Sequence, residues 1–534
     1  MDTPELVIQR ALARQTPIRK AAAPGNSTIQ KFYAGRTIFV TGGSGFLGKL
    51  FIEKICRTCD IKNIYMLIRP KKNVNAQDRL LEILKDPAFQ SLHEELPNFP
   101  KKIITVEGDI TVKRLGLSDN DWNTIVNEVD MIFHIAANVR FDVELKEAII
   151  SNVGGTREML TLGKACTNLR AYVHVSTAYT FATKDRFGGL ILEEFQTSPA
   201  DPDAILEMAE AFSSEKLNQL TPALVKGWPN TYTFSKAIAE EAVRTLSEDL
   251  PICVVRPAIV VPTYVEPAPG WVDISNVYGP SGMILGLGMG VIKTLFANKK
   301  VRICFTPADL VTNAIIAAGW ETGNKPTTEE KKIEIYTVSN MRKPVTWGNI
   351  GAIMRTHRYT LATPKALWYC ESTETNRPFM FWLLTLLFHF VPAYLVDGLC
   401  SLLGKERRFV KLYKKMYKLT AVLSYFTLHD WQFSDDNTHR LYKRMSKADQ
   451  VIFNFDIATV DWIEVMKVWW IGLRKYIIKD ELKDTRYGNT KQKILCVANY
   501  TILALYLYVI GRIVFLAFLG IRTILGILFK TTGI

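Results

Sequence analysis

A glycine-rich loop between two regular segments constrains this 534-residue chain more than any other feature. Residues 36–40 form a short apolar run typical of a β-strand, and residues 49–56 have the amphipathic spacing of a helix. The eight residues between them read TGGSGFLG, and their glycines satisfy both GxGxxG and GxxGxxG. Such a turn lets the backbone approach a pyrophosphate, while the helix amino terminus supplies N–H donors and a partial positive charge. The pattern predicts a dinucleotide site, with a glycine-rich turn that binds no ligand as the alternative.

Further apolar runs read as β-strands, and helical stretches separate them. They cover residues 63–68, 103–106, 131–135, 172–175 and 252–255. This alternation predicts an α/β fold built on a doubly wound parallel sheet. We expect cofactor contacts directly after the third and fourth strands, where the adenine and the middle of the cofactor would lie. The residues at these places are Asp109, Ile110, Ala136, Ala137 and Asn138.

The end of the second strand indicates which dinucleotide is bound. Arg69 stands there, 21 residues after Gly48, with Arg79 and two lysines, Lys71 and Lys72, nearby. An acidic residue at this place would bind the ribose hydroxyls of NAD, whereas an arginine accommodates the 2′-phosphate of NADP. The sequence therefore favours NADPH over NADH.

Candidate catalytic residues follow the fifth strand and open a later helix. Ser176 and Thr177 end the strand, and Tyr232 and Lys236 are spaced i and i+4, so that both project from one helix face. A free tyrosine has a pKa of about 10, and a nearby ammonium lowers that pKa toward the range useful for acid–base catalysis. Ser176 or Thr177 could hold the substrate oxygen. An ordinary helix pair on a solvated face is the alternative for Tyr232 and Lys236.

The composition of the chain narrows the classes of partner and ligand that it could bind. The net charge is +14, from 66 Lys and Arg against 52 Asp and Glu, which fits nucleic acid, an anionic membrane or an anionic substrate. Because zinc-finger, RNP-like and helix-turn-helix patterns are missing from the sequence, we expect no nucleic acid partner. The eight cysteines are scattered, and the CxxC pair Cys56 and Cys59 reads as helix packing, so we expect no metal site.

The carboxyl end has the composition of a membrane anchor. Residues 494–529 are apolar but for a few positions, too long for one untilted span and short for two, so a tilted span and a hairpin are both open. Residues 476–493 form a basic linker before it, and positive flanks stay on the cytosolic side. We expect a catalytic part in the cytosol, since the amino terminus lacks a signal-peptide pattern. A second apolar stretch, 379–388, is too short to span; we expect it to pack in the core, with an interfacial element or a wall for an acyl chain as the alternatives.

Two further segments have less defined patterns. Residues 1–35 are polar, basic and aperiodic, and we expect a flexible tail there. Residues 190–225 are acidic and amphipathic, which indicates a helical insertion between the fifth strand and the catalytic helix, either a solvated cap or a lid over a substrate.

Taken together, these stretches resemble an extended short-chain dehydrogenase/reductase, and more narrowly the alcohol-forming fatty acyl-CoA reductases of animals. The resemblance rests on FVTGGSGFLGK (39–49), IYMLIRPKK (64–72), GDI (108–110), FHIAANVRFD (133–142), NVGGTRE (152–158), VHVSTAY (173–179), PNTYTFSKAIAE (229–240), VVRPAIVVP (254–262), EPAPGWVD (266–273), GPSGMILGLGMG (279–290) and HFVPAYLVD (389–397). The chain departs from the family's pattern between WVD and GP, after VSTAY, and at RPAIV in place of RPSIV.

The resemblance implies a Rossmann-like domain over 36–345, a mostly helical domain over 346–475, and the membrane anchor. It implies that the glycine turn surrounds the pyrophosphate through Thr41, Gly42, Gly43, Gly45, Phe46, Leu47 and Gly48. It implies that Arg69 and Arg79 meet the 2′-phosphate, that Tyr232 donates the proton, and that Lys236 tunes it. The implied reaction takes a long-chain acyl-CoA to a primary alcohol through an aldehyde-level intermediate.

Two other functions share many of these residues. A membrane-bound hydroxysteroid dehydrogenase would have the same loop, tyrosine and lysine, although the stretches 379–475 and GWVD argue against it. A catalytically silent lipid-binding scaffold would have kept only the fold. Because the chain ends in TTGI rather than SKL, the endoplasmic reticulum is favoured over peroxisomes or lipid droplets. No sequence feature predicts an oligomeric state.

Overall fold

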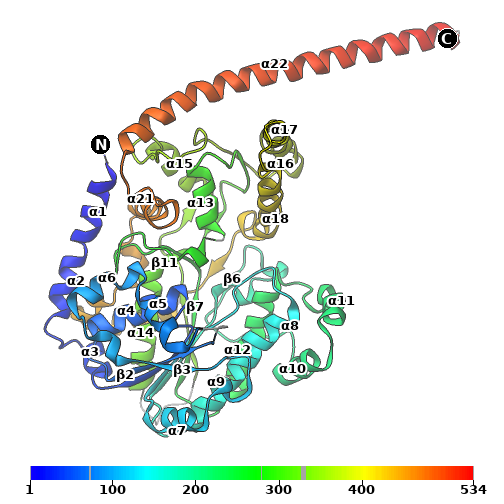
Figure 1. The fold of residues 1–534 in the computed structure, drawn as a ribbon. Helices are drawn as coiled ribbons and strands as arrows, with labels where there is room; N and C mark the ends of the chain where they lie inside the picture. The colour runs from blue at the N-terminus through cyan, green and yellow to red at the C-terminus, as the bar shows by residue number, and fades with distance from the viewer. Residues whose placement is uncertain (1, 71–73, 278, 326–331, 533–534) are drawn as a thin grey trace.

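A parallel sheet with helices on both faces organises residues 37–338 of the chain. The computed structural model describes residues 2–70, 74–277, 279–325 and 332–532. Seven parallel strands lie in the order β12-β7-β5-β4-β1-β2-β3 (Figure 1). Their bounds are β1 Thr37–Thr41, β2 Asn63–Ile68, β3 Ile103–Glu107, β4 Met131–His134, β5 Ala171–Val175, β7 Ile252–Pro257 and β12 Glu334–Val338. The order reverses between β1 and β4, the point at which doubly wound sheets bind ligands.

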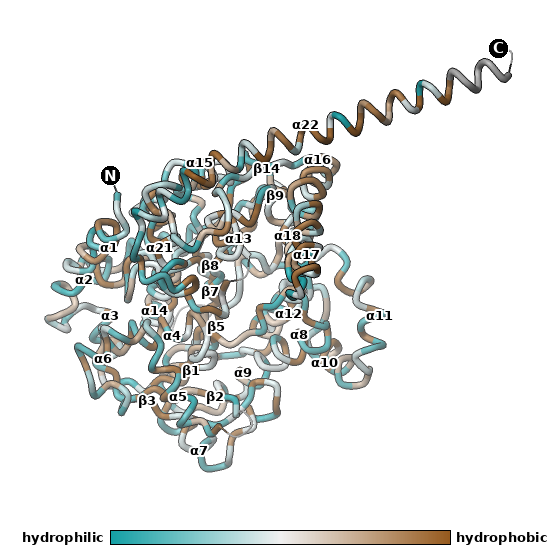
Figure 2. Tube along the Cα trace, turned by 45° about the horizontal axis from the view of Figure 1, so that its top comes forward, coloured by the Kyte–Doolittle hydropathy of each residue, from teal (hydrophilic) through white to brown (hydrophobic). Residues whose placement is uncertain are grey.

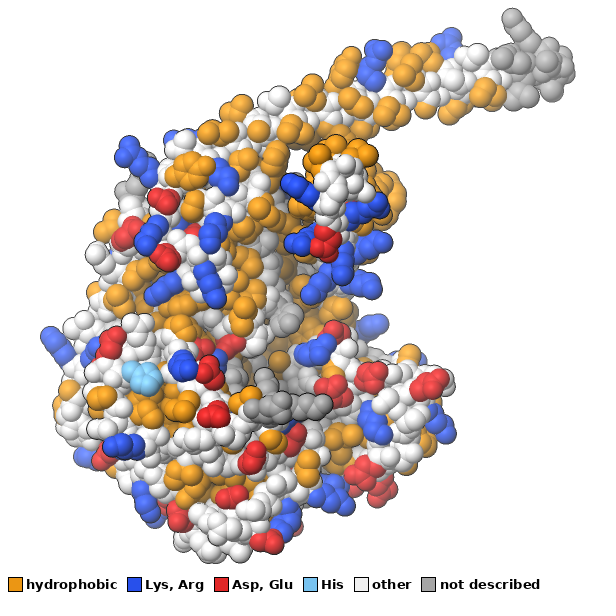
Figure 3. Space-filling model, viewed as in Figure 1, with side chains coloured by type: hydrophobic (Ala, Val, Ile, Leu, Met, Phe, Trp, Pro, Cys, Tyr) orange, Lys and Arg blue, Asp and Glu red, His pale blue; other side chains and the backbone are white. Residues whose placement is uncertain are grey.

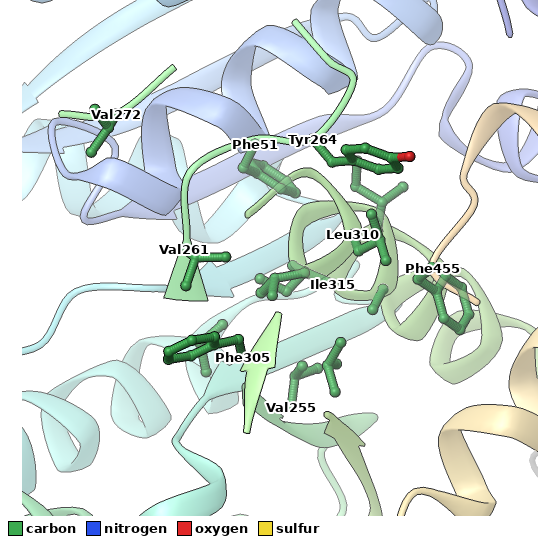
Figure 4. Packing of buried hydrophobic residues seen from close by; sticks show 14 of the residues in the cluster. Phe51, Val255, Val261, Tyr264, Val272, Phe305, Leu310, Ile315 and Phe455 are labelled. Carbon is green, nitrogen blue, oxygen red and sulfur yellow. The ribbon is translucent and has the colours of Figure 1, made fainter. Parts of the chain in front are cut away.

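The predicted fold class is confirmed, because the expected strands are present and both faces of the sheet are covered. Side chains of β1 alternate between the faces: Ile38 and Val40 belong to one apolar cluster and Phe39 to another. The first cluster contains Phe51 of α4 (Phe46–Thr58) and Ile315 of α14 (Ala308–Asn324), as Figure 4 shows. The second contains residues of α7 (Asp119–Glu128), α9 (Gly155–Ala165) and α12 (Thr231–Leu246).

The flexible tail expected for residues 1–35 is wrong, because three packed helices occupy that stretch. They are α1 Pro4–Ala13, α2 Gln15–Ala22 and α3 Thr28–Tyr33. Thr3 caps α1, and Ser27 and Gln30 form a capping box on α3. Val7 and Tyr33 are fully buried, and the Tyr33 hydroxyl donates to the Ile316 carbonyl oxygen over 2.7 Å.

The carboxyl-terminal region is mostly helical, as expected, and is joined to the catalytic domain. Its helices are α15 Trp347–His357, α16 Pro378–Thr385, α17 Val391–Leu402, α18 Phe409–Thr427, α19 Asp436–Arg444, α20 Lys447–Ile452 and α21 Trp462–Gly472. Strand β15 (Gln432–Phe433) pairs with β6 (Leu190–Ile191), and β14 (Thr373–Thr375) pairs with β9 (Thr294–Phe296). The insertion 190–225 is helical only from α10 (Pro202–Ala211) and α11 (Ser214–Leu224) onward.

The last element is one long helix, so the structure selects the single helix over the hairpin. Helix α22 (Thr485–Thr532) starts inside the expected linker and continues past Gly511 and Gly520 (Figure 1). The helix projects away from the body of the molecule and is mostly hydrophobic along its length (Figure 2), and many of its apolar side chains are exposed.

The stretch 379–388 does not pack in the core as expected. It covers most of α16 and the start of the π-helical segment Leu386–Phe390, and Phe379 is 70% exposed and Trp382 51% exposed. Helix α17 follows, with Leu402 85% exposed. The stretch Pro378–Leu402 and α22 are both long and apolar enough to cross a membrane.

Candidate active site

The glycine turn brings the start of α4 against the loop that follows β4. Gly42 has a φ of +75°, and a Cβ there would lie 2.6 Å from the Ala136 nitrogen. A Cβ on Gly48 would lie 2.1 Å from the Gly42 carbonyl oxygen, and one on Gly43 would lie 2.9 Å from the Met66 side chain. Gly45 is the N-cap of α4, and among the described residues no side chain caps this helix. The first N–H groups of α4 are therefore free to bind an anion.

The other residues of this turn contribute mainly as supports. The Thr41 hydroxyl lies 2.8 Å from His134 Nδ1 and accepts a hydrogen bond from the Ala136 N–H, so its side chain fixes the two loops to each other. Phe46 stacks on Trp271, with ring centroids 5.2 Å apart. Leu47 packs beside these rings. The Thr41 carbonyl oxygen accepts from the Ile135 N–H, so only the backbone N–H groups of Phe46 and Leu47, in the uncapped first turn of α4, are left for a ligand.

The arginines expected at the 2′-phosphate lie together: Arg69 follows β2, and Arg79 lies on α5 (Ala76–Leu84). Arg69 Nε is 2.8 Å from Asp109 Oδ2, and the Arg79 guanidinium donates to the Arg69 carbonyl oxygen. The Arg69 side chain is 62% exposed, so it can turn toward a ligand. Ile110 is buried and packs against Gly155. Lys71 and Lys72 lie outside the described residues.

A side chain that sequence reasoning did not select, Asn152, positions the loop after β4. Its Oδ1 accepts from the Asn138 N–H over 2.8 Å, and its Nδ2 donates to Ser235 Oγ of the catalytic helix over 2.9 Å. The Asn138 side chain turns away to Glu147 Oε1, at 2.8 Å. Ala137 is partly buried between these contacts. Asn152 belongs to the quoted stretch NVGGTRE, but only the structure shows what it joins.

Helix α12 carries Tyr232, Lys236 and Glu240 on one face. Asn230 caps the helix through the Thr233 N–H, which places Tyr232 in the first turn. Burial raises the pKa of the Tyr232 hydroxyl, and a hydrogen bond with Thr177 opposes that rise. Burial lowers the pKa of Lys236 to about 8, against the effect of the Glu240 charge. Lys236 Nζ donates to the Val175 carbonyl oxygen over 2.8 Å, which holds the ammonium at the end of β5.

The two hydroxyl residues after β5 have different partners. Ser176 Oγ donates to Glu240 Oε1 over 2.5 Å, whereas the Thr177 hydroxyl donates to the Pro257 carbonyl oxygen over 3.4 Å and accepts from the Tyr179 N–H. Thr177 also lies close enough to the Tyr232 hydroxyl to oppose the rise of its pKa. Glu240 also forms a fully buried ion pair with Arg256, at 2.5 Å. Arg256 then donates to the carbonyl oxygens of Leu192 and Glu194. Glu240 and Arg256 were both missed by sequence reasoning, although they lie inside the quoted motifs 229–240 and 254–262.

Aromatic rings lead from Tyr232 to the carboxyl-terminal helices. The centroid of Phe141 lies 6.1 Å from that of Tyr232 and 5.9 Å from that of Phe426 on α18. Phe426 also contacts Tyr179, at 5.2 Å. The surroundings of the tyrosine hydroxyl are therefore apolar on this side, and a residue of α18 helps to form them.

Comparisons with known proteins agree with this geometry. Two family models, both described as "Male sterility protein" and the first an NAD-binding model, match residues 40–315 and 388–480. The chain is 35% identical over 481 residues to "Fatty acyl-CoA reductase wat" of Drosophila melanogaster, covering 90% of this chain and 91% of that protein. It is 32% identical over 458 residues to human "Fatty acyl-CoA reductase 2", covering 85% and 87%.

Two solved structures share the fold. The terminal R domain of the myxalamid PKS-NRPS pathway aligns with a TM-score of 0.55 at 21% identity, covering 83% of this chain and 91% of that one. The reductase domain of a non-ribosomal peptide synthetase from Mycobacterium tuberculosis aligns with a TM-score of 0.53 at 16% identity, covering 89% and 99%.

Sheet, glycine turn and Tyr–Lys helix define the class of protein, an oxidoreductase that uses a nicotinamide cofactor. Within that class, the chain belongs to the fatty acyl-CoA reductase family.

Proposed function

We propose that the protein reduces long-chain acyl-CoA to primary fatty alcohol with NADPH, releasing CoA. The observation that carries the proposal is the contact of Tyr232 with Thr177 on one side and with the aromatic path Phe141–Phe426 on the other. A polar hydroxyl pair at the end of an apolar approach suits a carbonyl at the head of a fatty chain.

The dinucleotide fits the residues present. A side chain at Gly42 or Gly48 would fill the turn, and the uncapped start of α4 suits a pyrophosphate. Arg69 and Arg79 would bind a 2′-phosphate, which is why we propose NADPH rather than NADH. When bound, the cofactor supplies the hydride.

The chain's own residues supply the proton and hold the carbonyl. Thr177 and Tyr232 donate hydrogen bonds to the substrate oxygen, which gains negative charge as hydride adds to the carbon. Tyr232 then gives its proton to that oxygen. The Lys236 ammonium favours the tyrosinate that remains. The first reduction gives a hemithioacetal. Its hydroxyl returns the proton to Tyr232 as the carbon–sulfur bond breaks, which leaves the aldehyde and releases CoA as a thiolate that takes a proton from water. The aldehyde then receives a hydride from a second NADPH and the proton of Tyr232, which gives the alcohol.

We also propose that α22 anchors the protein in a membrane with the catalytic domain in the cytosol. The exposed apolar side chains of α22 support this, as does the basic stretch before them. Arg474, just before that stretch, is fully buried and forms an ion pair with Asp480 at 2.8 Å, so it does not meet headgroups. We propose the endoplasmic reticulum as the membrane, with peroxisomes and lipid droplets as alternatives.

Product analysis tests the reaction. Membranes with the protein receive acyl-CoAs of graded chain length with NADPH or NADH, and Tyr232→Phe is the control. Fatty alcohol formed by the wild type alone, and faster with NADPH, is the expected result. If aldehyde accumulates as the only product, the enzyme stops after one hydride. Turnover of sterols without thioester turnover would indicate the hydroxysteroid alternative, and absence of any product would indicate the scaffold.

A further inference from the structure

One face of α18 carries a row of lysines that have no role in the proposed reaction. The lysines stand at spacing i, i+3, i+4 and i+7, which places them on the same side of a helix. They are Lys411, Lys414, Lys415 and Lys418, and all four are exposed. Helix α18 contains no acidic residue. In the part of the chain that the structure describes, no ion pair holds any of the four. Lys and Arg side chains gather around this helix in Figure 3.

The opposite side of α18 is packed, which fixes the direction of the lysine row. Tyr413 stacks on His389, with ring centroids 4.7 Å apart, and its hydroxyl donates to the Val291 carbonyl oxygen. Leu423 is buried. The helix therefore cannot turn its lysines toward the core.

The same row continues into the active site. Phe426 stands eleven residues after Lys415, three helical turns along the same side, and it contacts Phe141, the neighbour of Tyr232. Lys415 also acts on the loop that carries Phe141. Hydrogen bonding to Arg140 lowers the pKa of Asp142, and the Lys415 charge lowers it further. The lysines thus lie at the outer end of the path whose inner end is the catalytic tyrosine.

The spacing along α18 matches the length of the acyl carrier. At a rise of about 1.5 Å per residue, Lys418 is about 12 Å and Lys411 about 22 Å from Phe426 along the helix. The pantetheine arm is an extended chain comparable to four or five residues, so it reaches about 15 Å. The thioester would lie at Tyr232, whose ring is up to about 12 Å beyond Phe426 by way of Phe141. An extended pantetheine arm of about 15 Å therefore brings the pyrophosphate of CoA only toward Lys418, at the inner end of the row, and the 3′-phosphate, one nucleotide further along, toward Lys415 and Lys414.

We propose that Lys411, Lys414, Lys415 and Lys418 of α18 form the binding site for the phosphate groups of CoA. This inference rests on the proposed reduction of acyl-CoA. Several ammonium groups on one rigid helix attract a polyanion at long range and then form charge-assisted hydrogen bonds with it. The carboxyl-terminal region would therefore select CoA thioesters, while the catalytic domain performs the chemistry.

The test compares three substrates in one variant. The variant replaces the four lysines by glutamine, and the substrates are palmitoyl-CoA, palmitoyl-pantetheine and hexadecanal. We expect the KM for palmitoyl-CoA to rise about tenfold or more with little change in kcat. Because palmitoyl-pantetheine and hexadecanal lack the nucleotide phosphates, their kinetics should stay within about twofold of wild type. In the wild type alone, salt should raise the KM for palmitoyl-CoA.

A matched control replaces four exposed lysines elsewhere, Lys62, Lys85, Lys101 and Lys447, by glutamine; all three substrates should then behave as in the wild type. An unchanged KM for palmitoyl-CoA in the α18 variant would overturn the proposal, and so would an equal change for all three substrates. If the variant instead loses binding to anionic vesicles while keeping its KM, the row serves lipid headgroups.

A binding measurement separates this inference from the proposed reaction. Calorimetry with CoA, in protein saturated with NADP⁺, reports the lysine site without turnover. Wild-type binding that weakens about tenfold or more in the variant supports the site even if no thioester is reduced. Equal binding by both proteins contradicts it even if the reaction is confirmed.

Discussion

The Ser176 hydroxyl donates to Glu240 Oε1 over 2.5 Å, although the next residue, Thr177, interacts with the hydroxyl of Tyr232, the proposed proton donor. The two adjacent hydroxyls therefore have different partners: Ser176 contacts the buried Glu240–Arg256 ion pair, and we propose that Thr177 holds the substrate oxygen. This difference leads to a prediction that contrasts the two residues.

Thr177→Val should lower kcat about 10²-fold, because it removes a hydrogen bond to the developing oxyanion. Ser176→Ala should instead lower the free energy of unfolding by about 1–2 kcal/mol and leave kcat within about tenfold of wild type. Steady-state kinetics and thermal unfolding of the two variants check this. The assignment is wrong if Ser176→Ala has the larger effect on kcat.

Tyr232→Phe should reduce kcat by about 10²–10⁴-fold while NADPH binding is largely kept, because the change removes only the proton donor. Nucleotide fluorescence titration measures binding, and product formation measures turnover. Full activity in this variant would remove Tyr232 from the mechanism.

The activity should decrease at alkaline pH because Lys236 loses its proton there. Its pKa is lowered to about 8 by burial, so the ammonium is present below about pH 8 and lost above it. We expect kcat/KM to decline as the pH rises through about 8. Burial of the Lys236 ammonium opposes folding. The contribution of Lys236 to the free energy of unfolding should therefore rise with pH between about 8, its pKa in the folded protein, and about 10.4, its pKa in the unfolded chain.

Thermal unfolding in parallel therefore distinguishes titration from denaturation. Above about pH 8 the activity should fall, whereas the deprotonation of Lys236 should not lower the melting temperature. Lys236→Met should be slow at every pH and should lack the decline near pH 8. A decline that persists unchanged in Lys236→Met would assign it to another group.

Arg69→Ala should raise the KM for NADPH about tenfold and leave the KM for NADH within about twofold, because only NADPH carries the 2′-phosphate. Arg19→Ala is a matched control, since Arg19 is also exposed and also ion-paired, with Glu95 at 2.7 Å. Equal losses with both cofactors would mean that Arg69 supports the fold of this region instead of reading the phosphate.

The elements that the sequence predicted well are those determined by local pattern. The glycine turn and the first strands follow from short-range spacing and reappear at their expected positions. The amino-terminal helices were missed because their partners are distant in sequence: the Ile29 N–H donates to Asp449, and Asp2 pairs with Lys467. A polar, aperiodic segment gives no sign of such contacts, which form only when the ends of the chain meet.

The candidate site, too, could be predicted from the sequence only where local spacing relates its residues. Sequence reasoning identified Tyr232 and Lys236 because a helix fixes their relation at i and i+4. It did not separate Ser176 from Thr177, since two adjacent residues after a strand differ only in the direction of their side chains. Asn152 and Arg256 join loops that no local pattern relates.

Removal of residues 508–534 should convert the protein from an integral to a peripheral membrane protein. The first part of α22 is bound to the body, because Trp368 Nε1 donates to Asn499 Oδ1 over 2.8 Å and the Tyr506 hydroxyl donates to the Leu387 carbonyl oxygen over 3.0 Å. A chain that ends at Leu507 keeps these contacts and loses the projecting apolar helix. Helix α17, with Leu402 and Leu403 exposed, would still hold it loosely at a lipid surface.

Carbonate extraction of membranes measures the difference. We expect carbonate to release the shortened chain and to leave the full chain in the pellet, because a spanning helix resists extraction whereas interfacial binding is reversible. Reduction of hexadecanal by the released protein would show that the catalytic domain stays folded. Release of the full chain by carbonate would contradict a span at α22, and retention of the shortened chain would mean that Pro378–Leu402 itself enters the bilayer.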